Sequence, residues 1–325
     1  MLNYIVQRYN FLMSLADPRV SHLPLMQSPI PTIVICLSYV YFVKILGPAL
    51  MKNRKPFDVR RLMLVYNFFM VLFSVCLIIM GSRRYFTDLS FKCAPVNYSQ
   101  SPEALEELYS SYIYYVSKFI EFLDTIFFVL RKKNEHVSAL HVIHHGIMPF
   151  SVWWGVKFVP GGHAIFFGWA NSIIHSIMYT YYGLAAFGPK VQKYLWWKKY
   201  LTLLQIIQFI AIGIHSFQLL FRECDFPKVF CYWIGFHGFL FLALFMDFYK
   251  KAYSVKEAKK AIITANDTSH TNGIANGNGH VLTTATNGKS IGRVKGIDFF
   301  ACSNNSTHYN NCNNNNDWSE LKKEE

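Results

Sequence analysis

Acidic residues are scarce in this sequence. Its 325 residues include 19 Asp and Glu against 32 Lys and Arg, which gives a formal charge of +13, and 52% of the residues are hydrophobic. Such a positive excess could serve a nucleic-acid partner, but the Lys and Arg residues stand in short clusters between apolar stretches, where membrane topology places them. The composition therefore predicts an integral membrane protein whose surroundings are a lipid bilayer, with no nucleic-acid partner.

The pattern of a removable signal peptide is also missing. Residues 1–29 contain no basic segment followed by a short apolar core and a small-residue cleavage site, and they end in prolines. We therefore expect residues 1–29 to form a lumenal N-terminal segment, and the first apolar span to act as the targeting signal.

Seven apolar stretches reach the length of about 20 residues that a bilayer-spanning helix requires. They cover residues 31–50, 62–81, 112–130, 137–156, 164–187, 200–220 and 229–249. Lys and Arg are concentrated in alternate connections, which the positive-inside rule assigns to the cytosol. The predicted fold is an all-α integral membrane protein with seven transmembrane helices over residues 30–253, a lumenal N-terminus and a cytosolic C-terminus.

The composition changes in residues 254–325, which are rich in Asn, Gly, Thr and Ser. Such a segment cannot bury enough apolar surface to offset the entropy of ordering, so we expect a disordered cytosolic tail. Its last residues, KKEE, place Lys322 and Lys323 where a dilysine retrieval signal of the endoplasmic reticulum has its lysines.

Two cysteines and one glycosylation sequon fall in connections assigned to the lumen. Cys93 and Cys224 lie on this oxidising side, where a disulfide between them is one interpretation and two free thiols are the other. Asn97 begins an Asn-x-Ser sequon close to Cys93 and is accessible to glycosylation in this topology.

Ionisable side chains stand inside the apolar spans. In LHVIHH, residues 140–145, the side chains of His141, His144 and His145 share one helix face. Three imidazoles in a low-dielectric interior need polar partners, a substrate or a metal, and intramembrane ionisable groups usually mark functional sites. The alternative is a helix whose histidines only hydrogen-bond to neighbouring groups.

Three other spans carry polar side chains at a similar depth. The polar residues on these spans are Lys118, Glu121, Asp124, Asn171, His175, Tyr179, Tyr182, Gln205 and Gln208. Convergence of four polar stripes in the cytosolic half of the membrane predicts a site. Each stripe also has a structural interpretation, because Lys118 and Glu121 can form a self-sufficient ion pair, buried amides join helices and tyrosines pack.

These stripes carry a family resemblance. KFIEFLDT, LHVIHH, NSIIHSIMYTYY and TLLQIIQ are similar to the KxxExxDT, HxxHH, NxxxHxxMYxYY and TxxQxxQ motifs of the very-long-chain fatty acid elongases, in the same order. The resemblance covers residues 31–253. His136 and Gly146 depart from the residues that many members have there, which bears on substrate preference more than on the reaction.

The resemblance implies a 3-ketoacyl-CoA synthase of the endoplasmic reticulum membrane whose helices enclose an acyl tunnel. Such an enzyme joins a long-chain acyl-CoA with malonyl-CoA to give 3-oxoacyl-CoA, CO2 and CoA, and we expect no cofactor and no metal. The implied candidate partners are a second copy of the chain and the ketoreductase, dehydratase and enoyl reductase of the elongation cycle.

The resemblance also suggests roles for the polar residues. His144 is the expected nucleophile, since a neutral imidazole in a dry pocket can attack a thioester, with His175 as its partner and with His141 and His145 orienting the box. The expected donors to a developing oxyanion are Asn171, Gln205 and Gln208, and Glu121 and Asp124 would hold histidine tautomers. The CoA phosphates would meet Arg131, Lys132, Lys133, Lys198 and Lys199.

Two other classes of protein remain as alternatives. A membrane di-iron desaturase or hydroxylase also uses HxxHH boxes, but it needs several paired boxes and His175 stands alone. A seven-span receptor or transporter has no need of Glu, Asp, His and Gln at one depth, and the sequence shows no repeated halves. Bound iron would favour the first alternative, and acylation by an acyl-CoA would favour the condensing enzyme.

Overall fold

The computed structural model describes residues 1–88 and 93–254, and these residues form helices and connections without a β-strand. An apolar chain in a bilayer must satisfy its backbone polar groups internally, which a helix does. The predicted tail, with Lys322 and Lys323, lies outside the described residues apart from Ser254.

The helices follow the apolar stretches of the sequence. The longer elements are α1 (Leu2–Ser14), α2 (Ile30–Tyr41), α4 (Arg60–Asp88), α5 (Pro102–Ile120), α6 (Phe122–Leu130), α7 (Ala139–Phe158), α8 (Ile165–Ala186), α10 (Lys198–Phe217) and α11 (Lys228–Tyr249). The short ones are η1 (Pro18–Val20), η2 (Phe42–Leu46), α3 (Gly47–Met51), η3 (Asn134–His136), η4 (Gly162–Ala164), α9 (Pro189–Gln192), η5 (Gln218–Leu220) and η6 (Lys250–Ser254).

Four stretches among the described residues are long and apolar enough to cross a membrane. They are Ile30–Met51, Arg60–Arg83, Lys198–Leu220 and Lys228–Tyr253. The other three predicted spans coincide with α5 and α6, α7, and α8, whose hydropathy is lowered by the polar side chains of the candidate site. The part of the chain that the structure describes is therefore all-helical, with the apolar helices of a multi-pass membrane protein.

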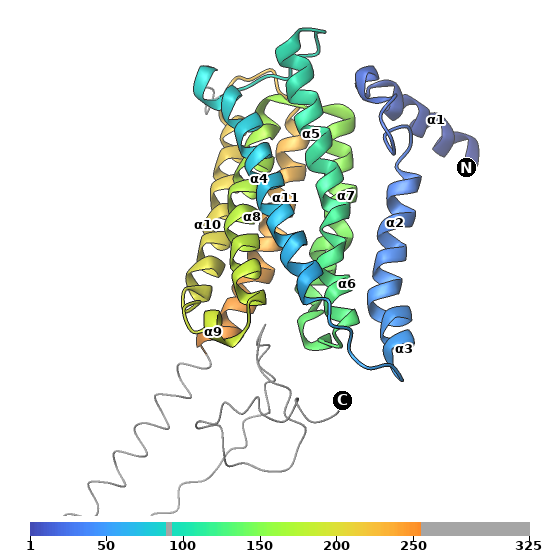
Figure 1. The fold of residues 1–325 in the computed structure, drawn as a ribbon. Coiled ribbons are helices and arrows are strands. Elements are labelled where there is room, and N and C mark those ends of the chain that lie inside the picture. Colours follow the sequence, from blue (N-terminus) through green and yellow to red (C-terminus); the bar gives the residue numbers. More distant parts are fainter. Residues whose placement is uncertain (89–92, 255–325) are drawn as a thin grey trace, which may run out of the picture.

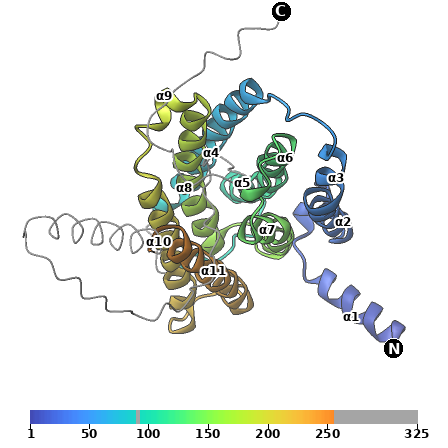
Figure 2. The same ribbon diagram turned by 90° about the horizontal axis from the view of Figure 1, so that it is seen from below.

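Six segments form a closed ring (Figures 1 and 2). Contacts join α4 to α8, α8 to α10, α10 to α11, α11 to α7, α7 to α5, and α5 back to α4. Helix α2 packs outside this ring against α7, and Figure 1 shows α1 turned away from the bundle at the same end as the start of α5. The ring encloses an interior into which the polar faces of its helices can point.

The helix that carries the KFIEFLDT motif is broken within it. Helix α5 ends and α6 begins at Glu121, which is both the C-cap of the first helix and the N-cap of the second. Helix α5 itself begins at Ser101, whose hydroxyl accepts a hydrogen bond from the backbone N–H of Ala104 (3.3 Å), with Pro102 in the first turn. The break places a buried carboxylate in the middle of a membrane-length element.

One end of the bundle is closed by covalent and polar contacts, and we name it the disulfide end. Cys93 and Cys224, the pair considered from the sequence, are joined by a disulfide with Cα atoms 5.7 Å apart. The nearby loop turns at Gly162, which has a φ of +57°, and its N–H donates to the buried Glu107 carboxylate (2.9 Å). We name the opposite end, which holds η3 and α9, the α9 end.

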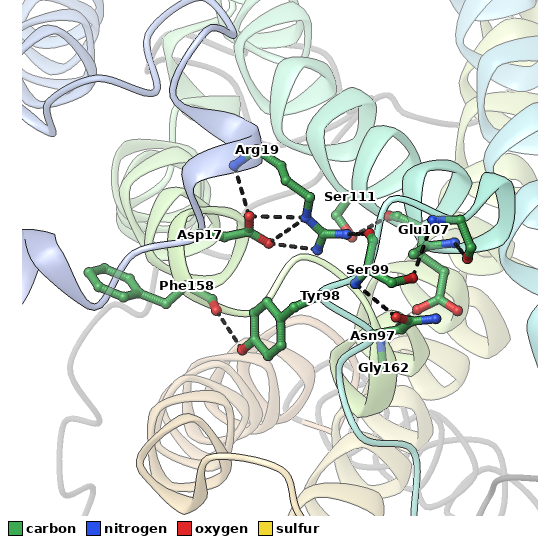
Figure 3. A network of polar contacts seen from close by, with 11 residues as sticks. Asp17, Arg19, Asn97, Tyr98, Ser99, Glu107, Ser111, Phe158 and Gly162 are labelled. Atoms are coloured by element: carbon green, nitrogen blue, oxygen red, sulfur yellow. Dashed lines mark hydrogen bonds and ion pairs between the residues drawn. The ribbon is translucent and has the colours of Figure 1, made fainter.

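A polar network fastens the N-terminal segment to the disulfide end (Figure 3). The Asp17 carboxylate pairs with the Arg19 guanidinium (2.6 Å), and both side chains are almost fully buried. Arg19 also donates to the carbonyl of Ser99, and the Tyr98 hydroxyl donates to the carbonyl of Phe158 (3.0 Å). Helix α1 and this attachment were not predicted for residues 1–29, which were expected only to form a lumenal segment.

Candidate active site

A cavity of about 110 Å³ lies inside the ring toward the α9 end. Helices α6, α7, α8, α10 and α11 contribute to its wall. The predicted site residues that line it are Asp124, His141, His144, His145, Asn171, His175, Tyr182, Lys198, Gln205 and Gln208. The structure therefore brings together all four polar stripes that the sequence placed at one depth.

The histidine box lies at the start of α7. Ser138 caps this helix by accepting a hydrogen bond from the backbone N–H of His141 (3.2 Å). The rings of His141 and His145 are 4.4 Å apart, and the His144 ring packs edge-on against Phe241 of α11 at 4.9 Å. The box thus faces the interior as one unit.

His141 is held by a hydroxyl rather than a carboxylate. The Thr125 Oγ1 atom lies 2.8 Å from His141 Nε2 and 2.7 Å from the Tyr39 hydroxyl. Thr125 is completely buried. This chain of hydrogen bonds links α2, α6 and α7 and fixes the orientation of the first histidine of the box.

The Glu121 carboxylate contacts both Lys118 and His175. Its Oε1 atom accepts hydrogen bonds from Lys118 Nζ (2.6 Å) and from the Ser117 hydroxyl (3.3 Å), and it lies 3.3 Å from Nδ1 of His175. The exposed fractions of Lys118 and Glu121 are 2% and 1%, so their pairing is required to keep both charged in the interior. The ion pair considered from the sequence is therefore present, and the same carboxylate also contacts the lone histidine of α8.

Asn171 is oriented by two donors from α5. The Tyr114 hydroxyl (2.8 Å) and Lys118 Nζ (3.1 Å) both donate to its Oδ1 atom. Because the oxygen is engaged on this side, the amide nitrogen of Asn171 is the group left to donate toward the cavity that it lines.

Comparison with known proteins identifies the family. The family described as ELO, GNS1/SUR4 family, matches residues 24–261. The chain belongs to this family.

Three relatives illustrate how far the similarity extends. A very long chain fatty acid elongase of Aedes aegypti is 52% identical over 262 residues, 80% of this chain and 73% of the relative. Very long chain fatty acid elongase 7 of Drosophila melanogaster is 54% identical over 261 residues, 79% of each chain. Very long chain fatty acid elongase 4 of Homo sapiens is 44% identical over 300 residues, 91% of this chain and 94% of the relative. The family resemblance inferred from the four motifs is therefore confirmed.

Within the described residues the hydrogen bond of Asp124 is made with a tyrosine, whereas the family resemblance suggested that it would hold a histidine tautomer. Its Oδ2 atom accepts a hydrogen bond from the Tyr179 hydroxyl (2.9 Å), and the Tyr179 ring is completely buried against Tyr66. Tyr179 lies one helical turn beyond His175, so its hydroxyl reaches the Asp124 side chain and occupies it. Thr125 holds His141 instead.

The two glutamines of α10 differ in their contacts. Gln205 donates to the sulfur of Met178 across the interface with α8 (3.8 Å). Gln208 is buried, and its amide nitrogen has no hydrogen-bond partner among the described residues. Since Gln208 lines the cavity, this nitrogen is a donor available to a substrate.

The five basic residues considered for CoA are distributed over three places. Lys198 lines the active-site cavity, and Lys199 follows it on α10, half-buried. Arg131 and Lys133 line a second cavity of about 330 Å³ that shares Asp124 and Tyr182 with the first. Lys132 donates to the backbone carbonyl of Lys52 (3.1 Å), so the structure does not bring it to either cavity.

The second cavity also contains a neutral histidine. His136, in the connection between α6 and α7, lines it, and burial lowers the pKa of His136 to about 4. At neutral pH its imidazole is therefore uncharged, and the positive charge of this cavity comes from Arg131, Lys133 and Arg60.

Two residues that shape the site had no role assigned to them from the sequence. Tyr114 stands one helical turn before Lys118 and orients Asn171, and Thr125 follows Asp124 and orients His141. Their positions in the motif region mark them as neighbours of the site, but their partners lie on other helices. Within residues 1–88 and 93–254, no group of three His, Cys, Asp or Glu side chains is arranged to hold a metal ion.

Proposed function

We propose that this chain is the condensing enzyme of fatty acid elongation, which joins a long-chain acyl-CoA to malonyl-CoA. The observation that carries the proposal is that His144 and His175 line one cavity, with Glu121 beside His175, in a chain of this family. The relatives named above are called very long chain fatty acid elongases, which supports the same reaction class.

In the first half-reaction, a ring nitrogen of His144 attacks the thioester carbonyl. A C–N bond forms, the C–S bond breaks, and CoA leaves as a thiolate that takes up a proton from solvent. The acylimidazolium that remains on His144 is a reactive acyl donor. The nitrogens of Gln208 and Asn171 are the proposed donors to the oxyanion that forms in between.

In the second half-reaction, malonyl-CoA loses CO2 and leaves an enolate. Its α-carbon attacks the acyl group, a C–C bond forms, the C–N bond to His144 breaks, and the 3-oxoacyl-CoA leaves with the imidazole neutral again. As an imidazolium paired with Glu121 through its Nδ1–H, His175 would donate its Nε2–H to the thioester oxygen of malonyl-CoA. His141 and His145, the other two histidines of the box, would orient it.

The proposed membrane topology follows from the position of the active-site cavity near the α9 end. We place the α9 end in the cytosol, where acyl-CoA and malonyl-CoA are found, and the disulfide end in the oxidising lumen of the endoplasmic reticulum. This corresponds to seven transmembrane helices with α1 on the lumenal side. The CoA phosphates would then meet Lys198 and Lys199 at one mouth, and Arg131 and Lys133 at the neighbouring cavity.

Two kinds of partner fit this function. A second copy of the chain and the ketoreductase, dehydratase and enoyl reductase of the cycle are the proposed neighbours in the membrane, since the 3-oxo product is the substrate of a reduction. Co-purification from cross-linked membranes tests each of them.

The proposal is tested with purified protein, palmitoyl-CoA and malonyl-CoA labelled at the free carboxyl. We expect 3-oxoacyl-CoA, labelled CO2 and CoA in equal amounts, without NADPH or oxygen. Malonyl-CoA decarboxylation without a 3-oxo product would contradict condensation. An iron-dependent hydroxylated or unsaturated product would instead support the di-iron alternative.

A further inference from the structure

Two apolar spaces adjoin each other at the disulfide end. An inner cavity of about 80 Å³ lies within the ring, between α4, α5, α7, α8 and α11. An outer groove of about 450 Å³ lies between the end of α1, the loop at Tyr98, α7 and α11. Val159, Phe230 and Trp233 line both spaces and therefore form a common wall.

The inner cavity is the next space beyond the active site. Tyr114 lines the inner cavity, Asn171 lines the active-site cavity, and the two side chains are hydrogen-bonded. From His144 to Val159, helix α7 rises by about 22 Å. An acyl group attached at His144 and directed toward the disulfide end would therefore pass Tyr114 and reach the common wall.

The straight path beyond the inner cavity is closed. The Gly162 N–H is bound to Glu107, the His163 N–H to the carbonyl of Ala94 (2.7 Å), and the His163 ring stacks on His215 at 3.8 Å. All of these contacts are buried and polar, so an apolar chain would have to break them to continue. The apolar direction available to a longer chain is sideways, toward the groove.

The groove is apolar and keeps a fixed shape. Leu12, Leu15 and Val229 on its rim expose 39%, 61% and 66% of their surface, as residues that face lipid do. Its cover is held in place by the network in Figure 3. In addition, the Asp17 N–H donates to the carbonyl of Lys157 (2.9 Å). The groove is thus a built feature whose chemistry suits a hydrocarbon chain.

The common wall consists of side chains that can move without breaking the fold. Phe230 is half-buried, and its ring lies 6.2 Å from that of Phe158 at a tilt. Trp233 is held more firmly, since its indole N–H donates to the carbonyl of Ser151 (3.3 Å) and its ring lies 4.6 Å from His237. Rotation of Phe230 is therefore the smallest change that joins the two spaces.

We propose that the inner cavity opens into the groove between α7 and α11 past Phe230, and that the groove receives the methyl end of acyl chains too long for the closed interior. This inference rests on the proposed function and adds to it a side exit that determines how chain length is accommodated. The occupant is the distal end of the substrate's own acyl chain.

Substitution of Phe230 tests the exit. With a ladder of saturated substrates from palmitoyl-CoA to hexacosanoyl-CoA, Phe230→Ala should raise the ratio of long-chain to palmitoyl-CoA condensation several-fold, and Phe230→Trp should lower it. Phe239→Ala is the matched control, because Phe239 lies on the opposite face of α11 and is 70% exposed. Equal ratios in all three variants and the unsubstituted protein would overturn the proposal.

Photochemical labelling tests the route in the unsubstituted protein. Acyl-CoA with a terminal diazirine should label the inner cavity, near Trp169, when the chain is short, and the groove, at Leu12, Leu15 or Val229, when it is long. Long chains that label only the inner cavity, or a groove filled by a bilayer lipid and never labelled, would refute the side exit. Absence of 3-oxoacyl-CoA from palmitoyl-CoA would instead refute the proposed function, and labelling would still report where the chain lies.

Discussion

The Nδ1 atom of His175 lies 3.3 Å from Oε1 of Glu121, the same oxygen that accepts a hydrogen bond from Lys118 at 2.6 Å. One buried carboxylate oxygen thus connects a lysine of α5 to the lone histidine of α8. In the proposed mechanism this contact presents the other ring nitrogen of His175 to the substrate, and it makes Glu121 a positioning residue.

Removal of the Glu121 carboxylate should lower both stability and condensation activity, and a second substitution should restore only the stability. Glu121→Ala leaves the buried Lys118 ammonium without its counter-charge, which costs about 3–5 kcal/mol of unfolding free energy. The double variant Lys118→Met with Glu121→Gln removes both charges and should recover most of the melting temperature while condensation stays low. Recovery of activity in the double variant would show that Glu121 has only a structural role.

Thr125→Val tests the hydrogen bond to His141. Loss of one hydrogen bond of about 1 kcal/mol corresponds to about a five-fold reduction in kcat if the bond orients the histidine box. Thr125→Ser keeps the hydroxyl and is the matched control, since it should retain near-normal turnover. Near-normal turnover in Thr125→Val, which keeps the methyl group, together with a loss in Thr125→Ser would attribute the effect to packing of that methyl group.

Tyr114→Phe removes one of the two donors to Asn171. Lys118 still binds the Asn171 Oδ1 atom, so we expect a melting temperature within a few degrees of the unsubstituted protein and a decrease in kcat of about ten-fold. The KM for the acyl-CoA should change little, because the Tyr114 ring still lines the inner cavity through which the acyl chain is proposed to pass. A change confined to KM would contradict the role of Asn171 as a donor to the transition state.

The disulfide contributes to stability by closing a long loop. Cys93 and Cys224 are 131 residues apart, and removing such a bond by a double substitution with Ser should cost about 2–5 kcal/mol. Cys76→Ser, at a free and exposed cysteine, should leave the melting temperature unchanged. Thermal unfolding in detergent, with and without reductant, measures both variants.

The helical architecture and the convergence of polar residues from several helices on one cavity could be predicted, because both follow from local patterns. Apolar length marks the helices, and helical spacing places His141, His144 and His145 on one face. The Lys118–Glu121 pair, at i and i+3, was also visible from spacing alone.

The contacts that cross between helices could not be predicted in this way. Asp124 and Thr125 are adjacent in the sequence, and either side chain could hydrogen-bond to a histidine. In the structure Asp124 binds Tyr179, and Thr125 binds His141. Lys132 has a backbone φ of +55° and donates to a backbone carbonyl, and the sequence pattern reveals neither feature. The partner of a polar side chain depends on how neighbouring helices are rotated about their axes. That rotation is set by the packing of the six helices in the ring.

In the proposed mechanism, His144 carries the acyl group between the two half-reactions. Purified protein incubated with palmitoyl-CoA alone should acquire an acyl adduct on the peptide that contains His141 to His145, and adding malonyl-CoA should release it as 3-oxoacyl-CoA. His144→Ala should give no adduct, and His145→Ala should retain it. Formation of 3-oxoacyl-CoA by the His144→Ala variant at the rate of the unsubstituted protein would contradict the account.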